Sequence, residues 1–411
     1  MELAQELEAR GLVADKTAAL PEIFSKTRTV YLGIDPTADS AQIGNLAVVL
    51  LMKRLGMAGH KLIFLVGGAT GMIGDPKEKG ERALLDEKTV RANARALKKQ
   101  LQGLLGKTRF RVVDNTTWLS KVPLVPFLRD IGKHFTVNEL IKRDTIRRRL
   151  ETPDESISYT EFTYTLLQGY DYLVLHQTYG CDLQIGASDQ WTNILSGVEL
   201  IRRKLGGEAH GLTAPLVTDA TGKKFGKSEG NAVWLDPKKT SPFVFYQFWL
   251  NQPDAELDTY LKFYTFLSLE EIETLMTLHA QNPGDRVAQM KLAWEVTTLV
   301  HGEAAAKTAA EASKALFGGT PLASLSGAAR AVVLREAPTH SVGAGTTLTD
   351  VLAESGLASS KGEARRLIEG KGVSLNGVLA EIDQLVSVDD FSHGLALLKK
   401  GRRDLLVLIL K

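Results

Sequence analysis

The chain has 411 residues, with 50 basic and 48 acidic side chains and a formal net charge of +2. At roughly 150 residues per domain, this length predicts two to three domains, each with its own core. The near-balanced charge excludes a global basic field, so any nucleic-acid binding must use local patches. The single cysteine, Cys181, excludes an internal disulfide and a cysteine-rich zinc site. It is typical of a reducing compartment.

Neither the N-terminus nor any apolar run predicts a membrane protein. The first residues are acidic and lack the apolar segment of a signal peptide. The apolar runs at 46–52 and 405–410 are too short to span a bilayer. We therefore expect a soluble, cytoplasmic protein without membrane contact.

The first 240 residues alternate between strand and helix patterns. Short apolar strands are predicted at 29–34, 61–66, 110–113, 182–186 and 212–217. Helical patterns at 46–55 and 88–105 separate the first three. This alternation predicts an α/β fold with a Rossmann-like, doubly wound parallel sheet. Ligands of such sheets bind beyond the carboxyl ends of the strands, where the sequence places Tyr31, Thr70, Asp75 and Asn115.

Residues 122–180 are mostly helical in pattern. In a helix predicted over 160–175, Tyr164, Gln168 and Asp171 fall on one face. Such a polar line faces solvent or a cavity, and its apolar surroundings favour the cavity. Four arginines form a basic cluster, for which a solvated helix face is the usual explanation and RNA contact the alternative: Arg143, Arg147, Arg148 and Arg149. Ser188 or Asp189 is a predicted N-cap of the next helix.

From about residue 241 the pattern becomes helical. Helices are predicted at 242–249, 256–263, 269–281, 286–301 and 303–316. Gly318-Gly319 and the small residues of 339–347 predict a boundary and a linker. A last unit begins near 346, and its Asn376-Gly377 pair predicts a hairpin.

Two loops carry the chemical signal. Residues 35–45 form a strand-to-helix turn, which offers backbone N–H groups and a helix dipole to an anion. Residues 224–228, Lys-Phe-Gly-Lys-Ser, place two lysines around a glycine, suited to neutralising a leaving polyphosphate. Alone, the first is more often plain packing and the second a solvated surface turn. Neither the P-loop nor the dinucleotide-binding glycine pattern is present.

Together the loops resemble the two signatures of class I aminoacyl-tRNA synthetases, His-Ile-Gly-His and Lys-Met-Ser-Lys-Ser. Further segments narrow the resemblance to the bacterial tyrosyl-tRNA synthetases: Asp35–Ser40, Leu65–Pro76, Phe127–Phe135, Leu167–Asp171, Ser188–Trp191 and Lys224–Ser228. The final residues, from about 346, resemble an S4-type RNA-binding domain. The resemblance covers nearly the whole chain.

The resemblance implies three domains. They are a Rossmann-like catalytic domain over 1–240, a helical anticodon-arm-binding domain over 241–335 and a small α+β S4-like domain over 346–411. The catalytic domain would include a helical connective and dimer segment at about 120–180.

It also implies a homodimeric tyrosine–tRNA ligase. L-Tyrosine would attack the α-phosphate of ATP to give tyrosyl-adenylate and pyrophosphate, and the tyrosyl group would pass to the 3′ end of tRNA(Tyr). ATP would enter as a substrate with Mg²⁺, without a tightly bound protein metal site.

Site residues carry over by position. Tyr31 and Asp171 would bind the substrate phenol; Asp75, Tyr164 and Gln168 would hold its ammonium, with Gln190 near its carboxylate. The nucleotide would lie against Gly33, Asp35, Gly44, Gly186, Asp189 and Lys227. Phosphates in the transition state would be contacted by Thr37, Gln42, Asn45, Lys79, Arg82, Lys224, Lys227 and Ser228. The predicted RNA contacts of the last unit are Lys361, Arg365, Arg366 and Lys371.

The sequence departs from the family at its best-known motif. Gln42 and Asn45 replace both histidines; an amide can donate to phosphate but cannot carry positive charge. Ile34 replaces an aromatic residue, and the loop at 77–82 is one residue shorter than in close relatives.

Two alternatives stay open. The loss of both histidines favours a catalytically impaired RNA-binding paralogue, which the intact second loop and tyrosine pocket oppose. A tryptophan-specific sister enzyme is opposed by Tyr31 with Asp171, because an indole has no phenolic hydroxyl.

Overall fold

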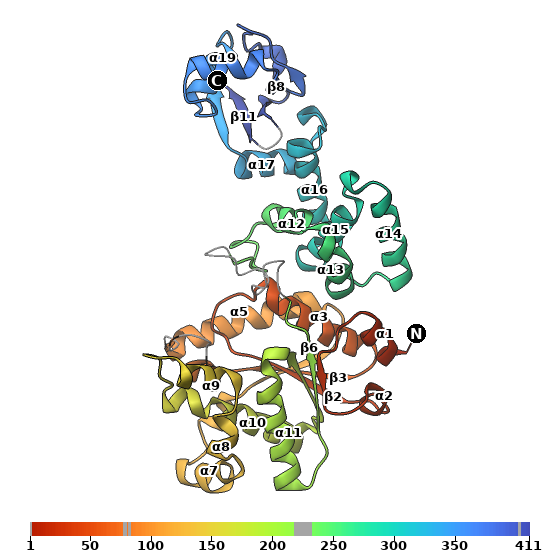
Figure 1. Cartoon of the computed structure of the whole chain (residues 1–411), viewed down its shortest axis with the longest axis vertical. Helices are drawn as coiled ribbons and strands as arrows, with labels where there is room; N and C mark the ends of the chain where they lie inside the picture. The colour runs from red at the N-terminus through yellow and green to blue at the C-terminus, as the bar shows by residue number, and fades with distance from the viewer. Residues whose placement is uncertain (1, 77–79, 81–83, 218–231, 402–403) are drawn as a thin grey trace. The chain divides into compact units, whose positions relative to one another are not determined.

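The computed structural model describes residues 2–76, 80, 84–217, 232–401 and 404–411, with the side chains of 144 and 145 left aside. It forms two compact units (Figure 1). The first comprises Met1–Lys239 with Ala255–Gln281, and the second comprises Thr240–Asp254 with Asn282–Lys411.

A six-stranded sheet forms the centre of the first unit. Its strands are β1 (Asp15–Lys16), β2 (Thr29–Ile34), β3 (Lys61–Val66), β4 (Phe110–Asp114), β5 (Leu183–Ala187) and β6 (His210–Ala214). Their order is β1-β6-β5-β2-β3-β4, and all neighbours are parallel except β1 and β6. The near-continuous apolar character of β3 fits a strand covered on both faces. The predicted doubly wound parallel sheet is therefore confirmed.

Helices cover both faces of this sheet (Figure 1). Those on one face are α3 (Ile43–Met57) and α5 (Glu87–Leu105); those on the other are α10 (Tyr159–Tyr179) and α11 (Trp191–Leu205). The chain begins with α1 (Leu3–Ala9) and α2 (Leu20–Ile23), and α4 (Thr70–Ile73) follows β3. Helix α3 is buried nearly all round, as its apolar sequence predicts.

Strand order reverses at β2. The chain runs from β2 outward to β3 and β4, then returns to the other side of β2 to form β5 and β6. Crevices outside the carboxyl ends of strands at such a reversal are the usual ligand sites of open α/β sheets.

The segment between β4 and α10 is a set of short helices: α6 (Thr116–Leu119), α7 (Leu124–Asp130), α8 (Val137–Leu140) and α9 (Asp144–Glu151). Here the expected solvated basic face is wrong for two of its four arginines. Arg149 is 2% exposed and pairs with the buried Glu161 at 2.8 Å. The Arg143 side chain turns inward between α10 and α11. Arg147 and Arg148 are exposed.

The N-cap prediction at 188 or 189 is also wrong. Residues Ser188–Gln190 form a 3-10 turn, and α11 begins only after it. This geometry directs the Ser188 hydroxyl to the backbone N–H of Leu216, at 3.2 Å, instead of to the helix end.

The predicted helices after residue 241 are present with small shifts in their ends. They are α12 (Pro242–Leu250), α13 (Leu257–Tyr264), α14 (Leu269–Gln281), α15 (Val287–His301), α16 (Glu303–Phe317) and α17 (Gly327–Glu336). Helices α13 and α14 pack in the first unit, where buried Arg10 and Arg54 donate to backbone carbonyls of Leu267 and Thr265. Helices α12, α15 and α16 pack together in the second unit.

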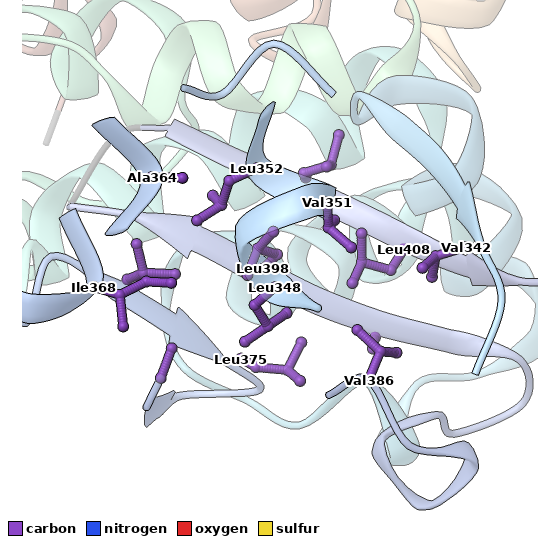
Figure 2. Packing of buried hydrophobic residues seen from close by; sticks show 14 of the residues in the cluster. Val342, Leu348, Val351, Leu352, Ala364, Ile368, Leu375, Val386, Leu398 and Leu408 are labelled. Carbon is purple, nitrogen blue, oxygen red and sulfur yellow. The ribbon is translucent and has the colours of Figure 1, made fainter. Parts of the chain in front are cut away.

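The C-terminal part of the second unit is a five-stranded sheet with two helices. Its strands are β7 (Thr339–Val342), β8 (Val373–Leu375), β9 (Val378–Leu379), β10 (Leu395–Lys400) and β11 (Asp404–Leu410), in the order β7-β11-β10-β8-β9. Helices α18 (Leu348–Glu354) and α19 (Lys361–Glu369) supply Leu348, Val351 and Ile368 to its core (Figure 2).

Two predictions about this part have opposite outcomes. The Asn376-Gly377 hairpin is confirmed: φ is 50° and 85° at the two positions, and β8 pairs with β9. The linker predicted over 339–347 is wrong at its start, because Thr339–Val342 is strand β7, paired in parallel with β11.

In the part of the chain that the structure describes, no helix is both long enough and apolar enough to cross a membrane.

Replacing Arg149 by methionine should destabilise the first unit strongly. The change leaves the Glu161 carboxylate, 1% exposed, without its cation, and breaking a buried pair in this way costs about 3 kcal/mol. We expect a clear fall in the urea midpoint of Arg149→Met. The exposed Arg148→Met is the matched control, expected within about 0.5 kcal/mol of wild type. Equal effects of the two substitutions would contradict the buried pair.

Candidate active site

A cleft of about 270 Å³ opens beyond the carboxyl ends of β2 and β5, where strand order reverses. We call it the outer cleft. It is lined by many of the residues that the sequence predicts: Gly33, Asp35, Thr37, Gln42, Gly44, Asn45, Asp75, Tyr164, Gly186, Asp189 and Gln190.

A second cavity, the inner pocket, continues from the outer cleft between β2, β5 and α10. The two share Gly33, Ile34, Asp35, Tyr164, Gly186 and Gln190. The inner pocket adds Tyr31, Gln168 and Asp171. Every described residue that is predicted to bind tyrosine, the nucleotide or the phosphates thus lines one of these two adjoining cavities. The polar face of α10 also faces a cavity, as predicted from the apolar residues around it.

Asp171 is a fixed, buried carboxylate. It is 1% exposed. Its Oδ2 accepts from Asn115 Nδ2 at 2.9 Å, and its Oδ1 accepts from Trp118 Nε1 at 2.7 Å. Burial raises the pKa of Asp171 to about 7, against the opposing effect of these two donors. At neutral pH this carboxyl is therefore near the midpoint of its ionisation, so the carboxylate and the protonated form are both populated.

Two polar atoms of the inner pocket have no partner among the described residues. They are the hydroxyl of Tyr31 and Oε1 of Gln184, both buried. Residues 31 and 184 are paired across β2 and β5. Burial raises the pKa of Tyr31, and nearby Asp171 adds to this, so the phenol stays protonated. Because unpaired buried polar atoms are costly, their presence in a pocket indicates a polar ligand.

Asp35 joins the two cavities. Tyr164 donates its hydroxyl to Asp35 Oδ2 at 2.8 Å, and Thr70 donates to Asp35 Oδ1 at 2.7 Å. Gly67 has to be glycine here, because a Cβ would collide with the Asp35 carboxylate. Burial raises the pKa of Tyr164, with Asp35 as the next cause. Asp35 is thus held at the boundary between the two cavities.

Asp75 also lines the outer cleft, where it accepts hydrogen bonds from two amides. Gln190 Nε2 donates to Asp75 Oδ2 at 3.0 Å, and Asn193 Nδ2 donates to Asp75 Oδ1 at 3.2 Å. Together with Asp35 and Asp171, this carboxylate makes the cavities attractive to an ammonium group.

The N-terminus of α3 forms another wall. Gln42 is its N-cap, and Asn45 Oδ1 accepts from the Gln42 N–H at 3.1 Å. This leaves the Asn45 amide N–H groups available to an anion. The helix end itself favours phosphate through its dipole and backbone N–H groups.

Described residues on either side of 218–231 lie at this cleft or next to it. Leu216 and Val217 line it on one side of the segment. On the other side, Val233 accepts from the backbone N–H of Ile43 at 3.0 Å, next to Gln42. The predicted phosphate contacts Lys79, Arg82, Lys224, Lys227 and Ser228 lie outside the described residues.

The sequence missed several residues that support the site. The sequence placed Thr70 and Asn115 at strand ends, but it did not predict the hydrogen bonds that they donate to Asp35 and Asp171. Trp118 and Asn193 carry no signal in the sequence, because their roles depend on contacts between distant segments.

Among the described residues, no three His, Cys, Asp or Glu side chains gather as metal ligands would.

An open, mostly parallel sheet, a crevice at its reversal point and a helix N-terminus at that crevice are features of α/β folds that bind nucleotides. The family model described as tRNA synthetases class I (W and Y) matches residues 25–318, and the S4 domain model matches 347–391.

Curated relatives match along nearly the whole length. The tyrosine–tRNA ligase of Roseiflexus castenholzii is 46% identical, over 98% of this chain and 97% of the relative. That of Anaeromyxobacter dehalogenans is 45% identical, over 98% of each. The chain belongs to the class I tRNA synthetases of the tryptophan and tyrosine group.

Solved structures agree in fold. A C-terminally truncated mitochondrial tyrosyl-tRNA synthetase from Aspergillus nidulans matches with a TM-score of 0.68 and 33% identity, over 76% of this chain and 94% of that one. A tryptophanyl-tRNA synthetase from Encephalitozoon cuniculi shares the fold, with a TM-score of 0.52, at 16% identity, over 74% of this chain and 86% of that one.

The raised pKa of Asp171 should make stability depend on pH. Between about pH 4 and about pH 7 the folded chain holds a proton that the unfolded chain has released. The free energy of unfolding therefore falls as pH rises through this window, by up to about 1.4 kcal/mol per unit.

Urea unfolding of wild type and Asp171→Asn tests this dependence. We expect wild type to lose stability relative to the variant from about pH 5 to about pH 7, and the difference to level off above about pH 8. A difference that does not vary with pH would show that burial does not perturb this carboxyl.

Proposed function

We propose that the chain is a tyrosine–tRNA ligase, which activates L-tyrosine with ATP and transfers the tyrosyl group to tRNA(Tyr). The names of its relatives support this. The structural observation that carries it is the inner pocket, which is lined by Tyr31, whose hydroxyl has no partner among the described residues, and by Asp171. A phenol can accept a hydrogen bond from the first and donate one to the second.

The amino acid would lie with its phenol in the inner pocket and its polar end in the outer cleft. Asp75, Tyr164 and Gln168 would hold the ammonium, and Gln190 would lie near the carboxylate. The support is their position on the walls of the adjoining cavities. A carboxylate oxygen of tyrosine would bond to the α-phosphorus of ATP as the bond to pyrophosphate breaks.

The nucleotide would occupy the outer cleft against Gly33, Asp35, Gly44, Gly186 and Asp189. A Cβ at Gly186 would meet the Gln190 and Ile194 side chains at 3.1 Å, so a larger residue here would press on the turn that leads into α11.

Charge that develops on the phosphates would be stabilised by hydrogen bonds and cations without a covalent enzyme intermediate. Thr37, Gln42 and Asn45 would donate from the start of α3. The side chains predicted to add further contacts are Lys79, Arg82, Lys224, Lys227 and Ser228. Mg²⁺ would arrive with ATP as part of the substrate.

In the second step, a hydroxyl at the 3′ end of the tRNA would attack the tyrosyl carbonyl and release AMP. We propose the cytoplasm as the compartment, because tRNA and ATP are available there. The tryptophan-specific alternative is disfavoured by the inner pocket, whose Tyr31 and Asp171 suit a hydroxyl that both donates and accepts.

We also propose a homodimer that uses the segment at about 120–180. Support comes from apolar side chains exposed on α7 and α8: Leu124, Val125, Leu128 and Val137. Exposed apolar patches of this kind often mark protein interfaces. A chain that sediments as a monomer at micromolar concentration would contradict the dimer.

The proposed domain roles follow the three-part division: catalysis over 1–240, the anticodon arm over 241–335 and RNA contact over 346–411. A fragment of residues 1–335 should still activate tyrosine but bind tRNA more weakly. An unchanged affinity for tRNA would contradict the proposed RNA contact of residues 346–411.

Pyrophosphate exchange into ATP tests the first step. With MgATP present, we expect exchange with L-tyrosine and none with phenylalanine or tryptophan at equal concentration. Phenylalanine would leave the buried Tyr31 hydroxyl without a partner and Asp171 without the hydrogen bond from the substrate. No exchange with any amino acid, from protein that still binds tRNA, would favour the RNA-binding paralogue.

Tyr31→Phe is the internal control of this test. It should raise the KM for tyrosine about tenfold, the effect of one neutral hydrogen bond. Discrimination against phenylalanine should fall by the same factor, while the KM for ATP stays within about twofold.

The RNA contacts of the last unit should appear in the salt dependence of tRNA binding. Lys361 already pairs with Asp350, and Arg365 lies 3.9 Å from Asp383. Arg366 is exposed and, among the described residues, has no carboxylate partner. Arg366→Ala should reduce the slope of log K against log salt by about 1. Lys16→Ala, a surface change in the first unit, should leave the slope unchanged; a change equal to that of Arg366→Ala would contradict a specific contact.

A further inference from the structure

Arg143 belongs to the basic cluster in sequence but not to its surface. Its guanidinium donates to Thr165 Oγ1 on α10 and, on α11, to Asn193 Oδ1 at 2.9 Å and to Ser196 Oγ. Nη2 also reaches the carbonyl of Thr192, at 3.4 Å. All four acceptors are neutral. Burial lowers the pKa of Arg143 to about 10, so the group is still charged at neutral pH.

Asn193 connects this cation to the outer cleft. Its Oδ1 accepts from Arg143 at 2.9 Å and from the Thr165 hydroxyl at 2.8 Å. A flipped amide would direct its NH₂ group at a guanidinium, which only donates. Asn193 Nδ2 is therefore fixed toward Asp75 Oδ1 and Gln190 Oε1, each at 3.2 Å.

Gln190 completes the chain of hydrogen bonds. Because its Oε1 accepts from Asn193, its Nε2 is left to donate to Asp75 Oδ2, at 3.0 Å. Both oxygens of Asp75 thus accept from amides whose orientation is set, bond by bond, from Arg143.

We propose that Arg143 is a positioning residue for the amino-acid substrate: acting through Asn193, it holds Asp75 in the orientation that receives the ammonium group. The inference rests on the proposed function, which assigns Asp75 to the ammonium. Arg143 lines neither the outer cleft nor the inner pocket, so it acts without touching substrate. With its two terminal nitrogens engaged inside the protein, it is poorly placed to contact an RNA phosphate, unlike its exposed neighbour Arg148.

Arg143→Met keeps most of the side-chain length and removes every donor. In pyrophosphate exchange without tRNA, we expect the KM for tyrosine to rise about tenfold while the KM for ATP stays within about twofold. The diagnostic ligand is 3-(4-hydroxyphenyl)propionate, which keeps the phenol and carboxylate of tyrosine but lacks the ammonium. Its inhibition constant against tyrosine should change by less than about twofold, because Asp75 has no ammonium to bind in it.

Asn193→Ala provides a second test that leaves the cation in place. It should raise the KM for tyrosine with the same selectivity, and the double variant should lose no more than the larger single loss. Arg202→Met removes an exposed arginine from the same helix, where it pairs with Glu199, and should change none of these constants. Thermal melting of each variant checks that the fold is retained.

Three results would overturn the proposal. They are an unchanged KM for tyrosine in Arg143→Met or in Asn193→Ala, a parallel loss for tyrosine and the ammonium-free analogue, and additive losses in the double variant. Absence of tyrosine-dependent exchange in wild type would instead contradict the proposed function itself, so the two failures are distinguishable.

Discussion

The parallel pairing of β2 with β5 is the constraint on which the site depends. Strand order reverses at β2, so the loops that follow β2 and β5 diverge to opposite faces and leave a crevice between them. The same register pairs Tyr31 with Gln184, which brings the two unpartnered polar atoms into one pocket. Shifting β5 by one residue against β2 would move the Gln184 side chain to the other face of the sheet, away from Tyr31.

Around that crevice, the carboxylates of the site accept hydrogen bonds from other side chains of the protein. Asn115 and Trp118 hold Asp171, Thr70 holds Asp35, and amides hold Asp75. Each bond offsets part of the cost of burying a carboxylate. The Tyr31 hydroxyl and Gln184 Oε1, which remain without a partner among the described residues, belong to side chains that line the inner pocket. The first unit is therefore preorganised for a polar ligand, because its donors and acceptors are fixed before the ligand arrives.

Periodicity and motif order predicted the strands and helices well. Buried strands are short apolar runs, and helices that bury one face repeat their apolar residues regularly. β2 and β3 have the predicted ends, and the site residues drawn from separate loops line adjoining cavities. What the sequence could not supply were contacts between segments far apart. Arg149 is charged and lies in a basic run, yet it is buried, where it forms an ion pair with Glu161. Thr339–Val342 reads locally as a linker and becomes a strand only because β11 offers an edge.

At the start of α3 the residues differ from the family pattern, because amides replace the two histidines. Gln42 and Asn45 are neutral, so neither can neutralise phosphate charge as an imidazolium would. Asn45 Oδ1 is held by the Gln42 N–H, which turns the donor side of the amide outward. Hydrogen-bond donation and the helix dipole can therefore persist at this wall without a histidine. The net positive charge that a polyphosphate requires must then come from cations on other segments, which is the requirement that the lysines of residues 224–228 satisfy in the proposed mechanism.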